Sequence, residues 1–173
     1  MMAKIGVMID KMFEDVEYTQ PVKAFQEAGH EIINLGIRKI EVNGKKGKAS
    51  VQIDEKIADC DSSKFDAILI PGGCSPDNLR GEPEAVEFIQ KFSETNRPIF
   101  AICHAPQLLI TAQLIDGRKI TGWKSIVQDI KNAGGKYQDQ EVVEDGNLIS
   151  SRGPSDIPAF ISACLKKLDN INY

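Results

Sequence analysis

A cysteine followed directly by a histidine stands at the position in the chain best suited to chemistry. In the segment Ala101–Pro106 (AICHAP) an apolar run passes into a helical pattern with no polar linker before the cysteine. At such a strand-to-helix junction the backbone is strained, and the central side chain projects above the sheet. The residues two positions either side must be small, and here both are alanine. The pattern predicts that Cys103 is a nucleophile.

The helix expected after Cys103 would place unpaired N–H groups and a partial positive charge beside the sulfur. Both favour the thiolate, so we expect the pKa of Cys103 to lie below the ordinary value of about 8.5. The alternative is a buried cysteine that packs as a small hydrophobe, the usual role of a free thiol. His104 can pair with a thiolate and needs a carboxylate to orient it. His30, at a helix-to-strand turn, suits a surface or capping role.

Two segments could bring carboxylates to this junction. Residues 14–17 (EDVE) follow the first apolar run, and Asp77 lies in Pro71–Arg80 after another. A protonated carboxyl group against the sulfur could donate a hydrogen bond and exchange a proton, given a raised pKa. Gly72 and Gly73 let the backbone approach a ligand closely, and an N–H there could form an oxyanion hole with the amide of His104.

Alternating apolar runs and helical patterns must position these groups. We expect strands over residues 5–9, 31–35, 66–70 and 98–102, helices over 14–28, 82–94, 105–114, 124–133 and 156–168, an edge hairpin or excursion within 38–63, and a hairpin of 141–144 with 147–151. The pattern predicts an α/β fold, a flavodoxin-like three-layer sandwich whose mostly parallel sheet has helices on both faces and a late β-hairpin. Sites in such sheets form in the loops at the carboxyl ends of the strands.

Composition excludes several classes of function. The 173 residues suit a single domain over 1–173, and 21 basic against 25 acidic residues leave no basic face for nucleic acid or a membrane surface. Four cysteines without CxxC spacing and only two histidines argue against a zinc site. We expect no metal, no cofactor and a cytoplasmic location with reduced thiols.

Six segments carry a resemblance to a known family. They are IGVMI (5–9), MFEDVEYTQP (12–21), DAILIPGG (66–73), SPDNLRG (75–81), PIFAICHAPQLL (98–109) and DGNLISSRGPSD (145–156). Over nearly its whole length, and in the expected order, the chain resembles the PfpI intracellular-protease/deglycase family of the glutamine-amidotransferase-like superfamily. The cysteine elbow with its preceding PGG loop is the most specific of these motifs.

The resemblance implies a role for each matching residue. Cys103 matches the nucleophile and His104 the histidine that follows it. Glu17 matches the glutamic acid that hydrogen-bonds the cysteine, while Gly73 and His104 match the backbone donors of the oxyanion hole. Asp77 matches an acidic residue that completes the site of a neighbouring subunit, so the resemblance implies a homo-oligomer, a dimer or larger.

The family implies thiolate attack on a carbonyl or acyl carbon, by a protein deglycase, a glyoxalase or an intracellular peptidase in stress protection. The substrate would be a small aldehyde or a glycated or peptide group, and a compact site made by three short loops favours the small aldehyde. One alternative is a redox-responsive stress protein in which Cys103 is oxidised without turnover and Cys74 acts as a resolving thiol. A non-catalytic oligomeric binding module is another.

Overall fold

The main sheet of the protein is almost entirely parallel. The computed structural model describes residues 2–171. The sheet has the strand order β10-β11-β7-β6-β1-β2-β5 and is formed by β1 (Lys4–Met8), β2 (Glu31–Gly36), β5 (Glu55–Lys56), β6 (Ala67–Ile70), β7 (Ile99–Ile102), β10 (Val143–Asp145) and β11 (Leu148–Ser151). Adjacent strands are parallel, except that β10 runs antiparallel to β11. The predicted mostly parallel sheet with a late hairpin is confirmed.

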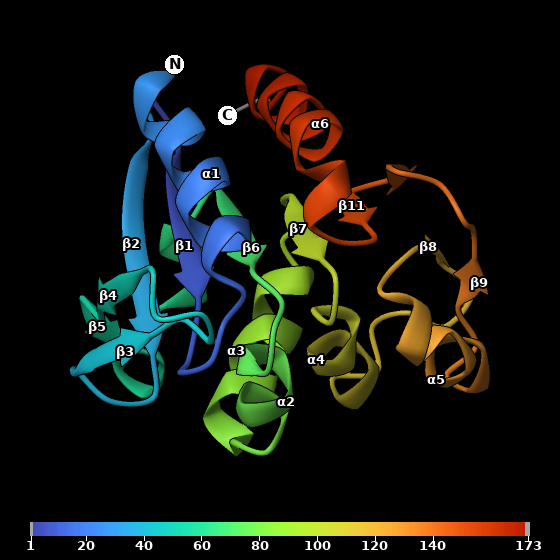
Figure 1. Ribbon diagram of the computed structural model, residues 1–173, viewed down its shortest axis with the longest axis horizontal. Helices are drawn as coiled ribbons and strands as arrows, with labels where there is room; N and C mark the ends of the chain where they lie inside the picture. The colour runs from blue at the N-terminus through green and yellow to red at the C-terminus, as the bar shows by residue number, and fades with distance from the viewer. Residues whose placement is uncertain (1, 172–173) are drawn as a thin grey trace.

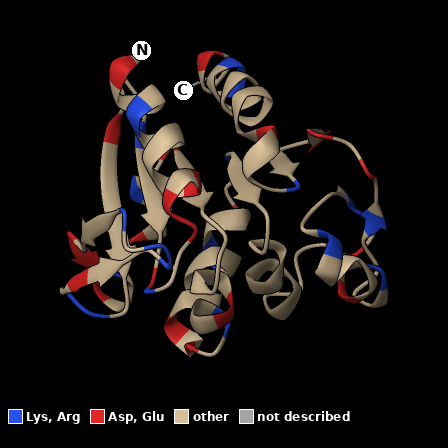
Figure 2. Cartoon of the chain, in the orientation of Figure 1, with Lys and Arg blue, Asp and Glu red and all other residues tan. Residues whose placement is uncertain are grey.

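The central strands are apolar without interruption because both of their faces are covered. In β6, Ala67 and Leu69 belong to one hydrophobic cluster, whereas Ile68 and Ile70 belong to the cluster on the opposite face. All four side chains are fully buried. Figure 2 shows no charged residue on β6 or β7, in contrast to the helices and outer loops.

Helices cover the two faces as the sequence predicted. One face carries α1 (Asp15–Glu27) and α6 (Ile157–Asp169), which pack against each other (Figure 1), and the other carries α2 (Ser75–Arg80), α3 (Pro83–Ser93), α4 (Pro106–Thr111) and α5 (Val127–Asn132). Phe25 and Phe160 fill the first layer, and Phe88 and Phe92 the second. The three-layer sandwich is confirmed.

Two small strand pairs lie outside the main sheet. The antiparallel hairpin β3 (Glu41–Asn43) and β4 (Ser50–Gln52) confirms the excursion expected within 38–63. The parallel pair β8 (Lys119–Ile120) and β9 (Lys136–Tyr137) lies beside α5 at the right of Figure 1. This second pair was not predicted, because two-residue strands are too short to show an alternating pattern.

Two boundaries differ from the sequence-based expectation. Pro71–Arg80 was expected to be a loop, but Ser75–Arg80 forms α2, with a proline in its first turn and Leu79 fully buried. The helix after the elbow begins at Pro106 and has only six residues. Among the helices within residues 2–171, none combines the length and the apolar character needed to cross a membrane.

Candidate active site

Cys103 occupies a strained turn between β7 and α4. Its φ is +64°, in the left-handed region that non-glycine residues rarely adopt. Its backbone N–H donates to the carbonyl of Ser151 at 3.0 Å, and its own carbonyl accepts from the N–H of Trp123 at 2.9 Å. Strand β11 and the segment at Trp123 therefore hold the elbow from two sides. Cys103 is buried, with only 6% of its surface exposed.

Glu17 lies on the first turn of α1 with its carboxyl group fully buried. Its Oε1 accepts a hydrogen bond from the backbone N–H of Gly72 at 2.9 Å. A methyl group at Gly72 would lie 2.5 Å from this oxygen and 2.6 Å from the Cβ of Cys103. Glycine at this position therefore lets the carboxyl group of Glu17 and the side chain of Cys103 occupy one shared space.

The buried carboxyl group of Glu17 holds its proton at neutral pH. Burial raises its pKa from 4.5 to about 8, and the charge of Glu14 acts in the same direction, while the N–H of Gly72 and the contact with Cys103 oppose the shift. At pH 7 Glu17 is thus a neutral acid, able to donate a hydrogen bond or a proton.

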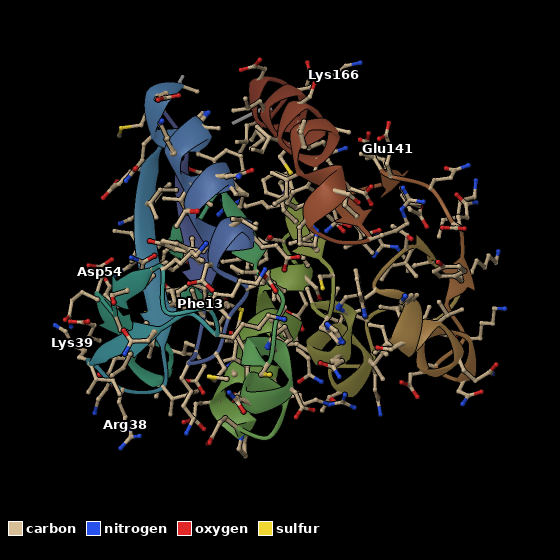
Figure 3. All side chains as sticks on the ribbon, in the orientation of Figure 1. Phe13, Arg38, Lys39, Asp54, Glu141 and Lys166 are labelled. Atoms are coloured by element: carbon tan, nitrogen blue, oxygen red, sulfur yellow. The ribbon has the colours of Figure 1, made fainter. Side chains whose placement is uncertain are left out.

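Gly73 brings a second backbone segment to the sulfur. Its φ is +74°, and a Cβ would lie 2.4 Å from the backbone nitrogen of Glu14, so only glycine fits. The backbone of Phe13 forms a β-bridge with Gly73. The side chain of Phe13 is buried, and it lies in the interior of the molecule in Figure 3, where the labelled side chains of Arg38 and Lys39 lie at the surface. The backbone N–H groups of Gly73 and His104 both act on the thiol of Cys103 to lower its pKa. Their expected role as an oxyanion hole stays a prediction.

The expectation of a lowered pKa for Cys103 is wrong. Burial is the first cause that raises the pKa of this thiol, and the charge of Glu17 is the second. The hydrogen bonds from Gly73 and His104 lower it without reversing the shift. The prediction from the sequence considered the helix N-terminus, which lowers the pKa of a thiol. It did not consider the burial of Cys103, which is only 6% exposed and whose charged form is therefore disfavoured.

His104 lies between the thiol and a serine. Its Nδ1 is 3.3 Å from the Sγ of Cys103, and its Nε2 is 3.3 Å from the Oγ of Ser125. The indole of Trp123 lies beside the ring, with centroids 6.3 Å apart. The pKa of His104 is lowered, by burial first and then by the ammonium of Lys45, so the ring is neutral at pH 7. Ser125 was not predicted, because no local pattern links it to a histidine 21 positions away.

Asp77 lies on the first turn of α2, near the site but outside it. Its side chain is 65% exposed and lies 4.0 Å from Nη1 of Arg80. The carboxylate of Asp77 acts to raise the pKa of His104, against the net lowering. Within residues 2–171 no hydrogen bond joins the two side chains. Its expected role in a neighbouring subunit stays a prediction. Cys74 is exposed and, like the other three cysteines, free, so the resolving-thiol idea also stays a prediction.

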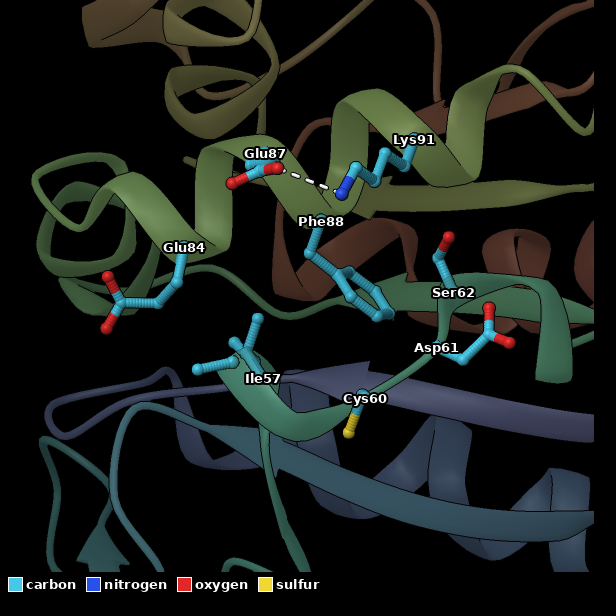
Figure 4. A pocket seen from close by; sticks show the side chains of 9 residues that line it. Ile57, Cys60, Asp61, Ser62, Glu84, Glu87, Phe88 and Lys91 are labelled. Atoms are coloured by element: carbon cyan, nitrogen blue, oxygen red, sulfur yellow. Dashed lines mark ion pairs between the residues drawn. The ribbon is translucent and has the colours of Figure 1, made fainter.

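A separate hollow of about 460 Å³ lies between α3 and Ile57–Ser62 (Figure 4). It contains Cys60, whose sulfur points away from α3 in that view. The Sγ of Cys60 donates to Oε2 of Glu55 at 3.1 Å and to the carbonyl of Lys56 at 3.0 Å. Burial and then Glu55 raise its pKa to about 12. In the described part of the chain no cluster of His, Cys, Asp and Glu could hold a metal ion.

Proteins of known sequence resemble this chain along almost its full length. It is 51% identical to "General stress protein 18" of Bacillus subtilis over 168 residues, covering 96% of this chain and 98% of that protein. It is 49% identical to "Protein/nucleic acid deglycase 2" of Escherichia coli over 170 residues, covering 97% and 99%. "Putative cysteine protease YraA" of Bacillus subtilis is 49% identical over 161 residues, covering 92% and 95%.

Solved structures agree with these relatives. A two-domain protein from Anabaena variabilis, with DJ-1/ThiJ/PfpI-like and ferritin-like domains, superimposes with a TM-score of 0.95 at 39% identity. The match covers 96% of this chain and about half, 48%, of that longer protein. The model of the DJ-1/PfpI family matches residues 3–167. The chain therefore belongs to the DJ-1/PfpI family.

Proposed function

We propose that the protein is a cysteine-nucleophile enzyme that acts on the carbonyl group of small aldehydes and of the adducts they form, as a glyoxalase or deglycase. The observation that carries the proposal is the strained Cys103 with a protonated Glu17 and two backbone donors, from Gly73 and His104, directed at it. A thiol that is 6% exposed favours a small carbonyl compound over a peptide main chain. The names of two relatives, a deglycase and a cysteine protease, support attack on a carbonyl or acyl carbon.

The thiolate forms by transfer of the thiol proton to His104. The Nδ1 atom of this neutral ring is 3.3 Å from the sulfur. Below about pH 8 Glu17 is uncharged, so its repulsion of the thiolate is absent and its proton can instead be donated to the sulfur. The N–H groups of Gly73 and His104 stabilise the anion further.

The chemical step is addition of sulfur to the carbonyl carbon. A C–S bond forms, and the π electron pair of the carbonyl moves to the oxygen, where the N–H groups of Gly73 and His104 hold it as an oxyanion. Glu17 supplies the proton that completes the hemithioacetal. With a 2-oxoaldehyde, a proton shift from this carbon to its neighbour gives a thioester. Hydrolysis of the thioester by water releases a 2-hydroxy acid and restores the thiol, with no external oxidant.

Methylglyoxal consumption by the wild type, Cys103→Ser and Cys60→Ser tests the proposal. We expect Cys103→Ser to lose about 1000-fold or more of the rate, because an alcohol is not deprotonated in this environment, and Cys60→Ser to stay within about twofold of the wild type. A wild type that consumes neither methylglyoxal, glyoxal nor a peptide substrate contradicts the proposal. So does a Cys103→Ser variant that keeps its rate.

A second candidate is a redox-responsive stress protein. It is favoured by the Oε2 atom of Glu17, which is buried and has no well-aligned hydrogen-bond partner within the described residues. A protonated Oε2 could donate to an oxygen added to the sulfur of Cys103 by a hydroperoxide, which is itself reduced to the alcohol or water. Mass spectrometry after peroxide treatment detects that oxygen. Oxidation of Cys103 in a protein without aldehyde turnover favours this candidate.

We also propose a homo-oligomer in which Asp77 approaches His104 of a neighbouring subunit. Support comes from the exposure of Asp77 and from the absence of a carboxylate hydrogen bond to His104 within residues 2–171 of one chain. A dimeric or larger mass in light scattering at micromolar concentration is expected. A monomeric mass would remove Asp77 from the site.

A further inference from the structure

A groove with a volume of about 710 Å³ lies between β3 and α2. Its apolar lining consists of Ile9, Ile37, Ile40, Val42 and Ile53. Two hydrogen bonds fix the walls relative to each other. The side-chain amide of Asn78 donates to the carbonyl of Lys11 at 3.1 Å, and the Oγ of Ser75 accepts from the backbone N–H of Asp10 at 2.8 Å. The groove is therefore a preformed feature of the fold.

Met12 lines the same groove and has a strained backbone. Its φ is +63°, in the left-handed region that a side chain with a Cβ disfavours. Hydrogen bonds hold it there, because its N–H donates to the carbonyl of Asn43 at 2.8 Å and its carbonyl accepts from the N–H of Cys74 at 2.8 Å. The single chain thus bears the strain while the methionine stays 45% exposed, which indicates a role outside the single chain.

The exposed apolar side chains are grouped at this groove. Within residues 2–171 three large apolar side chains are exposed, namely Met2 at 63%, Met12 at 45% and Ile40 at 44%. Both Met12 and Ile40 line the groove. Single exposed apolar residues are ordinary, whereas neighbouring ones around a groove mark a surface that binds another molecule.

Charged side chains of both signs also line the groove, and none forms an ion pair within residues 2–171. They are Asp10, Lys11, Arg38, Glu41 and Glu82. Elsewhere opposite charges do pair, as Lys91 does with Glu87 at 2.9 Å. Arg38 points away from the body of the molecule in Figure 3.

This mixture of charges selects the kind of partner. Two basic and three acidic side chains give no excess of positive charge, which argues against a nucleic acid or an anionic membrane. A second copy of the chain fits better. A two-fold axis brings the same face of both copies together, so that the bases of each copy meet acids of the other.

The groove adjoins the segment that carries Asp77. Asn78 follows Asp77 in α2, and Met12 is hydrogen-bonded to Cys74, the residue that caps the same helix. In the proposed homo-oligomer Asp77 approaches His104 of a neighbouring subunit. A copy that reaches Asp77 therefore lies beside the groove.

We propose that a second copy of this chain docks on the groove around a two-fold axis, with Met12 and Ile40 as the apolar anchors of the interface. The inference rests on the proposed homo-oligomer and specifies the face through which it forms. Docking buries the two exposed side chains and pairs the charges of the groove between the copies. The strained backbone holds Met12 in place before the copies meet, which lowers the entropy lost on association.

Sedimentation equilibrium of the full chain in Met12→Gly, Ile40→Ser and Met2→Gly tests this. A two-fold interface contains each side chain twice, so we expect the dissociation constant of the oligomer to rise about tenfold or more in Met12→Gly and in Ile40→Ser. Met2→Gly is the matched control, because it removes an exposed methionine that does not line the groove. Its dissociation constant should stay within about twofold of the wild type.

Urea unfolding of Met12→Gly distinguishes an anchor from a packing residue. Glycine adopts a φ of +63° without strain, so the unfolding midpoint of the variant should be no lower than that of the wild type at a concentration where both are monomeric. A clearly lower midpoint overturns the anchor role of Met12, and Ile40→Ser then decides whether the groove is the interface.

The failure of the inference and that of the homo-oligomer give different results. An unchanged dissociation constant in both groove variants overturns the inference and leaves the homo-oligomer to form through another face. A wild type that is monomeric up to about 100 μM overturns the homo-oligomer and the inference together.

Discussion

Cys103 and Cys60 each lie close to a glutamate that raises the pKa of the thiol, but backbone N–H groups oppose this rise only at Cys103. The thiol of Cys60 is a donor, to Glu55 and to the carbonyl of Lys56. The thiol of Cys103 has such a contact with Glu17 too, but the backbone N–H groups of Gly73 and His104 act on its sulfur in the opposite direction and lower its pKa. Donation requires the thiol to keep its proton, whereas accepted hydrogen bonds stabilise the thiolate.

The two glutamates differ as well. Glu55 is exposed on the surface, while Glu17 is fully buried and keeps its proton to about pH 8. A neutral acid can give a proton to an intermediate on the sulfur. The comparison teaches that proximity of a carboxyl group to a thiol does not by itself distinguish Cys103, and that the buried acid and the two backbone donors do.

The largest expected effect concerns the pH dependence of the free energy of unfolding. The pKa of Glu17 in the folded protein, about 8, lies above its ordinary value of 4.5. Its contribution is therefore fully present below pH 4.5 and is lost as pH rises to 8. Glu17→Gln should remove this loss, so that the variant gains about 4 kcal/mol relative to the wild type between these pH values. Urea unfolding at several pH values measures it.

The control for this prediction is Cys60→Ser, which leaves Glu17 untouched and should keep the pH dependence of the wild type. A Glu17→Gln variant whose free energy of unfolding runs parallel to that of the wild type from pH 4.5 to 8 would show that Glu17 is ionised throughout this range.

Gly72→Ala should produce the next largest effect. The new methyl group would lie 2.6 Å from the Cβ of Cys103 and 3.0 Å from the carbonyl oxygen of Ile102, neither of which can move freely. We expect a loss of about 2–4 kcal/mol in the free energy of unfolding. Gly81→Ala is the matched control, because its nearest atom would be 3.5 Å away, and it should stay within about 0.5 kcal/mol. Equal effects of the two substitutions in urea unfolding contradict the shared space of Glu17 and Cys103.

The smallest effect is expected for Ser125→Ala, which removes the hydroxyl 3.3 Å from Nε2 of His104. With its orientation less restrained, His104 should accept the thiol proton less well, and kcat for methylglyoxal should fall about two- to fivefold with little change in KM. Ser62→Ala, in the hollow of Cys60, should leave kcat unchanged. Loss of stability without a change in kcat would make Ser125 a packing residue.

Much of the fold and the centre of the site were predictable because their signals are local. Buried parallel strands appear as continuous apolar runs, as in 66–70 and 98–102, and the elbow at Cys103 lies in six consecutive residues. The acidic residues 14–17 follow the first strand, which suggested several carboxyl groups for the site, and the family resemblance singled out Glu17 among them.

The remaining features depend on contacts between distant segments. Ser125 approaches His104 through the turn at Trp123, and Asp15 and Glu14 bind residues 45 and 46, about thirty positions further along the chain. The raised pKa of Cys103 depends on burial by several segments, which the helix after the elbow could not reveal. Spacing in sequence does not encode these distances.

The pH dependence of iodoacetamide alkylation of Cys103 in the wild type and in Glu17→Gln tests the central claim most directly. The claim is that Glu17 and Cys103 share one buried space, in which the charge of Glu17 opposes ionisation of the thiol. Because glutamine carries no charge and Glu17 is the second cause that raises the pKa of Cys103, the midpoint of reactivity should move about one pH unit lower in Glu17→Gln. An unchanged midpoint, or one at higher pH, would contradict the account.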